Sequence, residues 1–189
     1  MSTLSDNLDR CLGERIRAER EVRGWSLTDL SERAAVSRAM IHKVERGESS
    51  PTAALLGRLC AAFSISISTL MARAEGQSGR VSRAEGRPVW VDPETGYRRE
   101  QISPPSDMPL DVVAVELPVG ARVAYGADNF TFVRQMIWVL AGDLTFHEGA
   151  TVHTLAAGDC LALGAPADCL YENRGDVPCR YTVLVVRPG

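Results

Sequence analysis

The spacing of apolar residues changes near residue 71, and this change constrains the fold more than any other feature of the sequence. Up to about Met71 the apolar residues recur every three or four positions, as on one face of a helix. After a charged stretch rich in small residues, the period falls towards two, as in half-buried strands. We therefore predict a helical domain over residues 8–71, a linker over residues 72–87 and a β domain over residues 88–189.

Five helices fit the first segment, because helix-start residues recur between its apolar blocks. The first helix is expected over about Leu8–Val22. Ser26 and Ser37 are expected to cap the second and third helices. The run Ser49–Thr52 is a start signal for the fourth helix, and Ser66 is a candidate cap for a short fifth one.

The second segment predicts strands, because its apolar runs are short and are broken by glycine, proline and aspartate. No stretch between the runs is long enough for a sizeable helix. An antiparallel sandwich or barrel is therefore expected. The predicted strand segments are Val112–Leu117, Met136–Leu140, Leu144–Phe146, Cys160–Leu163 and Tyr181–Val186.

Composition narrows the class of protein. The 189 residues contain no apolar stretch near the roughly 18 residues of a membrane span, and the N-terminus is polar and acidic. The five cysteines are scattered without a CxxC pair, so we expect no disulfide framework and a cytoplasmic protein. The net charge is −3, yet residues 1–72 carry ten basic and nine acidic residues, against eleven and fifteen in the remainder. This mild asymmetry is compatible with a local basic surface on the first domain.

The segment Leu12–Met71 resembles the phage-repressor-like (Xre-type) helix-turn-helix family over its full length. The resemblance rests on the W-S-L helix start at Trp25, on the pattern V-S-x-x-x-I-x-x-x-E-R-G over residues 36–47, and on the S-P-T at residues 50–52. It implies a five-helix, lambda-repressor-like domain that binds double-stranded DNA and regulates transcription.

The third helix would then be the recognition helix, which presents its outward, N-terminal side chains to base edges in the major groove. A bidentate arginine contacts guanine, a lysine contacts guanine or phosphate, and an alanine methyl contacts thymine. The alternative is an ordinary solvated helix face. The candidate base-contacting residues are Arg38, Ala39 and Lys43, the candidate phosphate-contacting residues are Ser26, Thr28, Ser37, Arg46 and Ser49, and His42 fits either group.

The resemblance also assigns a structural role to Arg20 and Glu45. In this family the equivalent pair ties the first helix to the recognition helix, through a charge-assisted hydrogen bond. We predict that Glu45→Ala loses stability before it loses sequence preference.

From about Pro88 the chain resembles the cupins, through QMIWVLAGDLTF from Gln135 and LAAGDCLALGAPADCLYENRGD from Leu155. The resemblance implies an antiparallel β-barrel of the cupin or jelly-roll type. The metal ligands of cupins are not preserved, so we expect no metal and no cofactor. The paired-histidine positions fall on Asn129 and Thr131 or on Asp128 and Phe130, the glutamate position on Gln135, and the third histidine position on Cys169.

Neutral polar groups on an apolar wall suit a small molecule, and a filled core is the alternative. The candidate ligand-binding residues are Asn129, Thr131, Gln135, Cys169 and Tyr171. His147 and His153 are expected to face each other across a hairpin as a surface pair rather than as a metal site. Cys169 has no basic neighbour in sequence, so a redox-sensor role is not favoured.

These features predict a homodimeric transcriptional regulator that is not an enzyme. Its β domain would dimerise and bind an unknown small-molecule effector, and its paired recognition helices would bind a near-palindromic operator. A first alternative is a cupin enzyme, an isomerase or oxygenase that carries a DNA-binding domain. A second is a protein-interaction module, such as an antitoxin-like partner.

Overall fold

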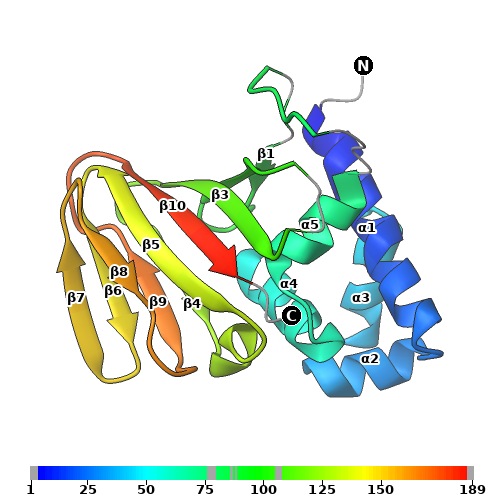
Figure 1. Cartoon of the computed structure of the whole chain (residues 1–189). Helices are drawn as coiled ribbons and strands as arrows, with labels where there is room; N and C mark the ends of the chain where they lie inside the picture. The colour runs from blue at the N-terminus through cyan, green and yellow to red at the C-terminus, as the bar shows by residue number, and fades with distance from the viewer. Residues whose placement is uncertain (1–3, 76–79, 86, 88, 105–107, 187–189) are drawn as a thin grey trace.

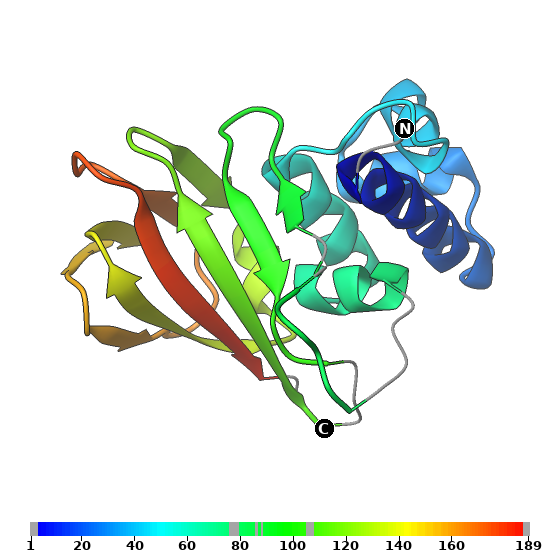
Figure 2. The same ribbon diagram turned by 90° about the horizontal axis from the view of Figure 1, so that it is seen from above.

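The helices gather on one side of the molecule and the strands on the other. The computed structural model describes residues 4–75, 80–85, 87, 89–104 and 108–186. Figures 1 and 2 show the helical domain packed beside the β domain in two views at right angles. Within the predicted linker, residues 76–79 and 86 lie outside the described part, as do residues 88, 105–107 and 187–189 of the predicted β domain.

Five helices form the first domain, as predicted. Ser26 caps the second in a capping box with Asp29, and Ser37 caps the third by accepting from the Met40 amide. The fifth helix continues past residue 71 into the range predicted as linker. The helices are α1 (Leu4–Val22), α2 (Leu27–Ala34), α3 (Arg38–Glu45), α4 (Ala53–Phe63) and α5 (Ile67–Glu75).

The helical core brings α1 unusually close to α3. Leu12, Ile16 and Ile41 are fully buried between the helices. A Cβ atom added to Gly13 of α1 would lie 2.2 Å from the carbonyl oxygen of Val44 in α3. No side chain fits at that distance, so glycine at this position sets the spacing between the two helices.

Ten strands form two antiparallel sheets in the described part of the β domain, without a strand pairing that joins one sheet to the other. The six-stranded sheet has the order β1-β2-β3-β10-β5-β8 and the four-stranded sheet the order β4-β9-β6-β7. This is the two-sheet form of the expected jelly roll. The six-stranded sheet contains β1 (Val89–Val91), β2 (Arg98–Gln101), β3 (Leu110–Leu117), β5 (Arg134–Ala141), β8 (Cys160–Ala162) and β10 (Cys179–Val186), and the four-stranded sheet contains β4 (Arg122–Tyr125), β6 (Leu144–Glu148), β7 (Thr151–Leu155) and β9 (Cys169–Glu172).

All five predicted strand segments are confirmed, with slightly different ends. Strict alternation marks β3 and β10, whose inward residues Val113, Val115, Val183 and Val185 are buried. The sequence analysis did not single out β1, β2, β4, β7 or β9. The hairpin of β1 and β2 matters most among these, because it joins the β domain to the helices.

The two domains share a packed boundary. Helix α4 contacts β4 and a short 3-10 helix (Ala127–Phe130), α1 contacts β1, and α5 contacts β2 and β3. A Cβ atom on Gly57 of α4 would lie only 2.9 Å from Asn129 Oδ1. The buried carboxylate of Asp92, in the β1–β2 turn, accepts a hydrogen bond of 3.0 Å from the amide of Ala53 at the start of α4. The β domain therefore supplies part of the N-terminal cap of a helix in the other domain.

Among the described residues, no helix has both the length and the apolar character needed to cross a membrane.

Candidate nucleic-acid interface and ligand cavity

Helix α3 turns one face to the core and the opposite face to solvent. Ile41 and Val44 are buried, and Arg38, Ala39 and Lys43 are exposed. A shallow hollow between α2 and α3 is lined by Arg38 and Ala39, together with His42 and with Leu27 of α2. The three predicted base-contacting residues thus lie on the accessible side of a two-turn helix.

The charges on this face are available for an external partner. Arg38 and Lys43 form no ion pair with another described residue, whereas Arg46 pairs with exposed Glu48 at 2.7 Å. Ser49 is half-buried. The remaining predicted contact residues, Ser26, Thr28, Ser37 and His42, are exposed.

Arg20 of α1 holds α3 in place, and this predicted contact is confirmed. Its Nε donates to Glu45 Oε1 at 2.7 Å and its second terminal nitrogen donates to Oε2 at 2.8 Å. A further hydrogen bond of 2.9 Å to the carbonyl of Trp25 anchors the start of α2. The hydrogen bond to Glu45 raises the pKa of Arg20 despite burial. The ion pair is therefore a clamp that fixes the orientation of the exposed face.

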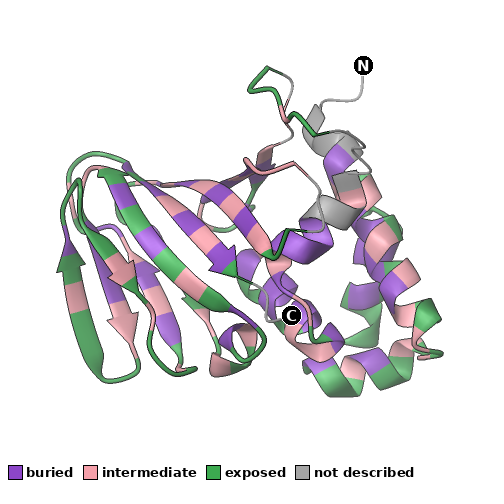
Figure 3. Cartoon of the chain, viewed as in Figure 1, coloured by how far each residue is buried: buried purple, intermediate pink, exposed green. Residues whose placement is uncertain are grey.

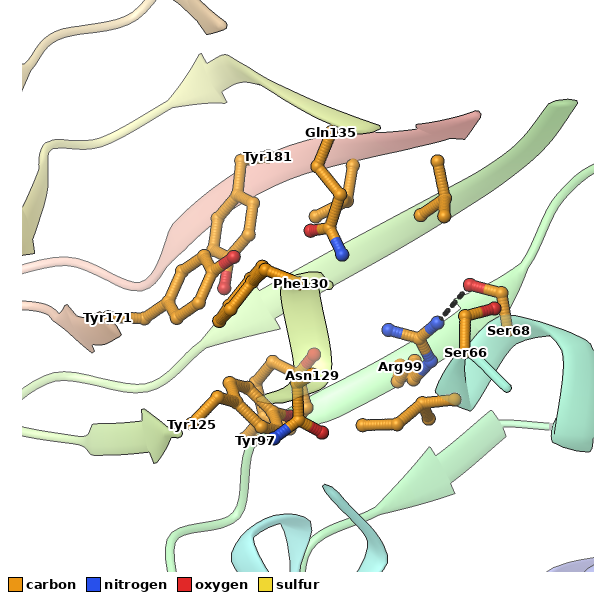
Figure 4. Close-up of a pocket in the computed structure, with 13 residues that line it drawn as sticks. Ser66, Ser68, Tyr97, Arg99, Tyr125, Asn129, Phe130, Gln135, Tyr171 and Tyr181 are labelled. Atoms are coloured by element: carbon orange, nitrogen blue, oxygen red, sulfur yellow. Dashed lines mark hydrogen bonds between the residues drawn. The ribbon is translucent and has the colours of Figure 1, made fainter. Parts of the chain in front are cut away.

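A cavity lies where the interior of the β domain meets the start of α5 (Figure 4). Tyr97, Tyr125, Tyr171 and Tyr181 supply much of its wall. The space that the centre of a water molecule can occupy is about 40 Å³. This is several times the roughly 10–15 Å³ that one water needs, so the cavity suits a few waters or a small molecule.

The tyrosines form a connected aromatic wall. The ring of Tyr171 stacks on Tyr181 with centroids 5.8 Å apart and meets Tyr125 edge-on at 6.0 Å. Burial raises the pKa of all three phenols well above the usual value, and neighbouring Tyr97 raises it further. The hydroxyl groups of these three tyrosines are therefore neutral at physiological pH.

Arg99 of β2 is the cationic group of the cavity. The residue is only 8% exposed, and its guanidinium donates a hydrogen bond to Ser68 Oγ of α5. It forms no ion pair with a carboxylate of the described residues. Burial works against its charged form, but the phenol oxygens of Tyr97 and Tyr125 outweigh this and raise the pKa of Arg99. A permanent positive charge thus lies inside the protein without an anionic partner.

Three of the five predicted ligand-binding residues lie together in this cavity, namely Asn129, Gln135 and Tyr171. Thr131 does not line it: the residue is exposed beside a separate hollow against the helical domain. Cys169 also lies outside it, although its side chain is buried. Thr131 follows a 3-10 turn, whose geometry differs from the strand spacing on which the cupin register was based.

Cys169 has the environment of a packing residue. Its Sγ donates to the carbonyl of Ala167 at 3.3 Å. Burial, followed by the charges of Glu148 and Asp168, raises the pKa of the thiol to about 12. A thiol with this pKa forms very little thiolate at neutral pH, which disfavours a redox role.

The residues of the β domain do not fit a cupin metal. His147 and His153 lie on adjacent strands, but each bonds its own carboxylate: Glu172 at 3.1 Å and Glu148 at 3.3 Å respectively. The described part of the chain contains no group of three or more His, Cys, Asp or Glu arranged to hold a metal ion. The cavity is lined by phenols, amides, hydroxyls and a guanidinium, which are poor ligands for iron, manganese or zinc.

Comparison with known proteins agrees with this architecture. Residues 12–70 match the helix-turn-helix domain family model. The chain is 26% identical over 183 residues to the HTH-type transcriptional regulator SutR of Escherichia coli (strain K12), covering 97% of this chain and 98% of SutR. The chain therefore contains a helix-turn-helix domain and is similar, over nearly its whole length, to a transcriptional regulator.

One solved structure has the same fold over nearly the whole chain. The crystal structure of an HTH_3 family transcriptional regulator from Vibrio cholerae superposes with a TM-score of 0.78 at 21% identity, covering 98% of this chain and 99% of that one. The cupin domain of an XRE family transcriptional regulator from Enterobacter cloacae covers 49% of this chain and 98% of its own length, with 17% identity and a TM-score of 0.46. The regulator from Vibrio cholerae thus has the same two-domain arrangement.

The sequence analysis missed the residues that give the cavity its charge. Arg99 stands in the run Tyr97–Gln101, whose charged residues resemble a solvated loop. The run Arg98–Gln101 has no alternation of apolar and polar residues that would indicate a strand, and its alternating burial appears only in the structure. Ser66 was identified only as a helix cap, and nothing in the sequence placed Ser68 beside the β domain.

Proposed function

We propose that this protein is a transcriptional regulator that binds a near-palindromic operator as a homodimer and responds to a small-molecule effector in the cavity of the β domain. The exposed cationic face of α3, held by the Arg20–Glu45 clamp, is the observation that carries the proposal. A recognition helix must be accessible and fixed in orientation to distinguish base edges, and α3 meets both requirements.

Individual contacts follow from side-chain chemistry. Arg38 suits a bidentate contact with guanine, Lys43 a guanine or phosphate, and Ala39 a thymine methyl. Hydroxyl groups and a second arginine around the helix would bind phosphates and fix the register. The candidate phosphate-contacting residues are Ser26, Thr28, Ser37, Arg46 and Ser49, and His42 fits either the phosphate-contacting or the base-contacting set.

The outer face of β5 supports the homodimer. Met136, Trp138 and Leu140 are 43%, 48% and 47% exposed, and they alternate with buried residues that face the core (Figure 3). Cys160 and Ala162 of β8 extend this face, since they pair with Trp138 and Met136. A two-fold symmetric contact between two such faces would cover apolar surface and pair the two DNA-binding domains.

The cavity supports effector binding rather than catalysis. It contacts α5, so a ligand inside it touches both domains. A ligand that prefers one arrangement of the domains changes operator affinity, typically by about 1–3 kcal/mol. Stoichiometric iron, manganese or zinc in the purified protein would contradict this part of the proposal and favour a cupin enzyme.

Selection of bound DNA from a random pool tests the DNA-binding function. We expect an inverted repeat with half-sites about one helical turn apart, or roughly 34 Å. Arg38→Ala should weaken binding to the selected site by about 1–3 kcal/mol and relax the preference at one base pair. The matched control is Arg98→Ala, which removes an exposed arginine of the β domain and should leave selection unchanged. Failure of folded wild-type protein to enrich any sequence at low salt would disprove the proposal.

Light scattering of the eluted protein tests the homodimer. The wild type should have the mass of two chains, and Trp138→Glu should shift it towards one, because a charge at the centre of an apolar contact is costly. Val119→Glu replaces another exposed apolar residue and is the control. A dimer unaffected by Trp138→Glu would place the interface elsewhere.

A further inference from the structure

We infer that the effector is a small organic acid whose anionic group pairs with Arg99, and that α5 and the β1–β2 hairpin transmit its presence to the DNA-binding domain. The inference rests on the proposed function, because it names the chemical class of the effector in the proposed cavity.

The guanidinium of Arg99 has no anionic partner among the described residues. Burying a cation is costly unless an anion or several hydrogen bonds compensate it. A guanidinium carries five N–H donors in a planar fork that matches a carboxylate. Within the described residues, Arg99 donates to the neutral oxygens of Ser68 and Tyr97 and to no carboxylate, and the guanidinium lies beside the cavity in Figure 4. An anion in the cavity would therefore supply the missing partner.

The start of α5 adds a second, independent attraction for an anion. Ser66 caps this helix: its Oγ accepts from the Thr69 amide at 3.0 Å and its carbonyl from the Leu70 amide at 3.0 Å. The amides of Ile67 and Ser68 belong to the first turn, which has no intrahelical acceptor. Both residues line the cavity. The positive end of the helix dipole thus meets the same space as Arg99.

The wall determines what kind of molecule carries the anion. No carboxylate lines the described cavity, and the phenols of Tyr125, Tyr171 and Tyr181 are neutral hydrogen-bonding groups. Val183 and Val185 supply apolar surface. The volume open to the centre of a water molecule is about 40 Å³. The site therefore suits an acid with a short apolar or aromatic body rather than a nucleotide or a peptide.

The route to the DNA-binding domain runs through one hairpin and two helices. Arg99 lies on β2 and bonds Ser68 of α5. On the same hairpin, Asp92 caps α4 through the Ala53 amide. An anion that draws the guanidinium away from Ser68 changes a direct contact between the domains. Occupancy of the cavity is thereby linked to the position of the helices that carry α3.

Calorimetry with the full-length protein tests the site. The probes are acetate, benzoate and methanesulfonate, each compared with its neutral amide at matched ionic strength. The acids should bind and raise the melting temperature, and the amides should not. Arg99→Met should weaken acid binding by about tenfold or more, since a charge-assisted hydrogen bond contributes about 1.5–3 kcal/mol.

Two further variants control for the charge of residue 99 and for its position. Arg99→Lys retains the charge and should restore part of the affinity, and Arg98→Met, at the exposed neighbouring position, should bind as the wild type does. Acid binding that is equal in the wild type and a folded Arg99→Met protein would overturn the inference. So would the absence of any preference for the three acids over their amides.

Operator affinity, measured on the same samples, separates this inference from the proposed function. A wild type that binds its operator but none of the acids overturns the inference and leaves the DNA-binding function intact. A wild type that binds acids through Arg99 but no operator overturns the proposed function alone. Unchanged operator affinity in the presence of a saturating acid overturns the proposed coupling.

Discussion

The helical domain and the β domain each contain a largely buried arginine, Arg20 and Arg99 respectively, and the two arginines differ in what neutralises them. In the helical domain the side chain of Arg20 is 12% exposed and makes two hydrogen bonds to the carboxylate of Glu45, which is itself 5% exposed. In the β domain Arg99 is 8% exposed, and its described hydrogen bonds go to the neutral hydroxyls of Ser68 and Tyr97. One charge is satisfied within the fold, and the other is not.

This difference separates a structural charge from a binding charge. Removing one partner of a buried ion pair leaves the other charge uncompensated, which is strongly destabilising. Removing a buried charge that has no anionic partner takes away a desolvation cost instead. The two arginines should therefore respond oppositely to mutation, and the following predictions test that contrast.

The largest expected effect is that of Glu45→Ala. The change leaves the largely buried Arg20 with only the exposed carboxylate of Glu21, at 3.7 Å, and should lower the free energy of unfolding by about 3–5 kcal/mol, as measured by urea denaturation. Glu48→Ala breaks only the exposed pair with Arg46 and should cost at most about 1 kcal/mol. Unchanged stability together with an altered operator preference would show that Glu45 contributes to specificity rather than to the clamp.

An intermediate effect is expected at the boundary between the domains. Asp92→Ala removes a buried acceptor from the first turn of α4 and should cost about 1–2 kcal/mol. Faster hydrogen exchange of the Ala53 amide would locate the loss at the cap. Glu94→Ala, at an exposed position in the same turn, is the control. If both variants exchange at the same rate as the wild type, the cap does not join the domains.

The smallest expected effect, and one of opposite sign, is that of Arg99→Met on the protein without added acid. Replacing an uncompensated buried charge with an apolar side chain of similar length should raise the free energy of unfolding by about 1 kcal/mol. Urea denaturation in acid-free buffer measures it. A loss as large as that of Glu45→Ala would mean that Arg99 is structural, and the contrast between the two arginines would fail.

Much of this protein could be predicted from the sequence because the relevant signals are local. Capping residues such as Ser26 and Ser37 act within one helical turn, and the recognition-helix pattern is contiguous. Alternation along β3 and β10 is likewise a property of neighbouring residues. The helical domain, the main strands and the face of α3 therefore followed from short-range spacing.

The ligand cavity could be predicted from the sequence only in part. The resemblance to cupins supplied the register for these candidates: Asn129, Gln135 and Tyr171 line the cavity, whereas Thr131 and Cys169 lie outside it. A 3-10 turn before Thr131 rotates that residue out to solvent. Strand alternation cannot be extended through such a turn, since the two geometries have different periods.

The sequence by itself determined the five helices, five of the ten described strands, and the side chains that α3 presents to solvent. Only the tertiary structure decided that Arg99 is buried, that Ser68 of the other domain is its partner, and that no described carboxylate neutralises it. The physical reason is the distance along the chain: the cavity joins residues from α5, β2, β4, β5, β9 and β10. Burial and charge compensation at such a site are set by packing between distant segments, which local patterns do not encode.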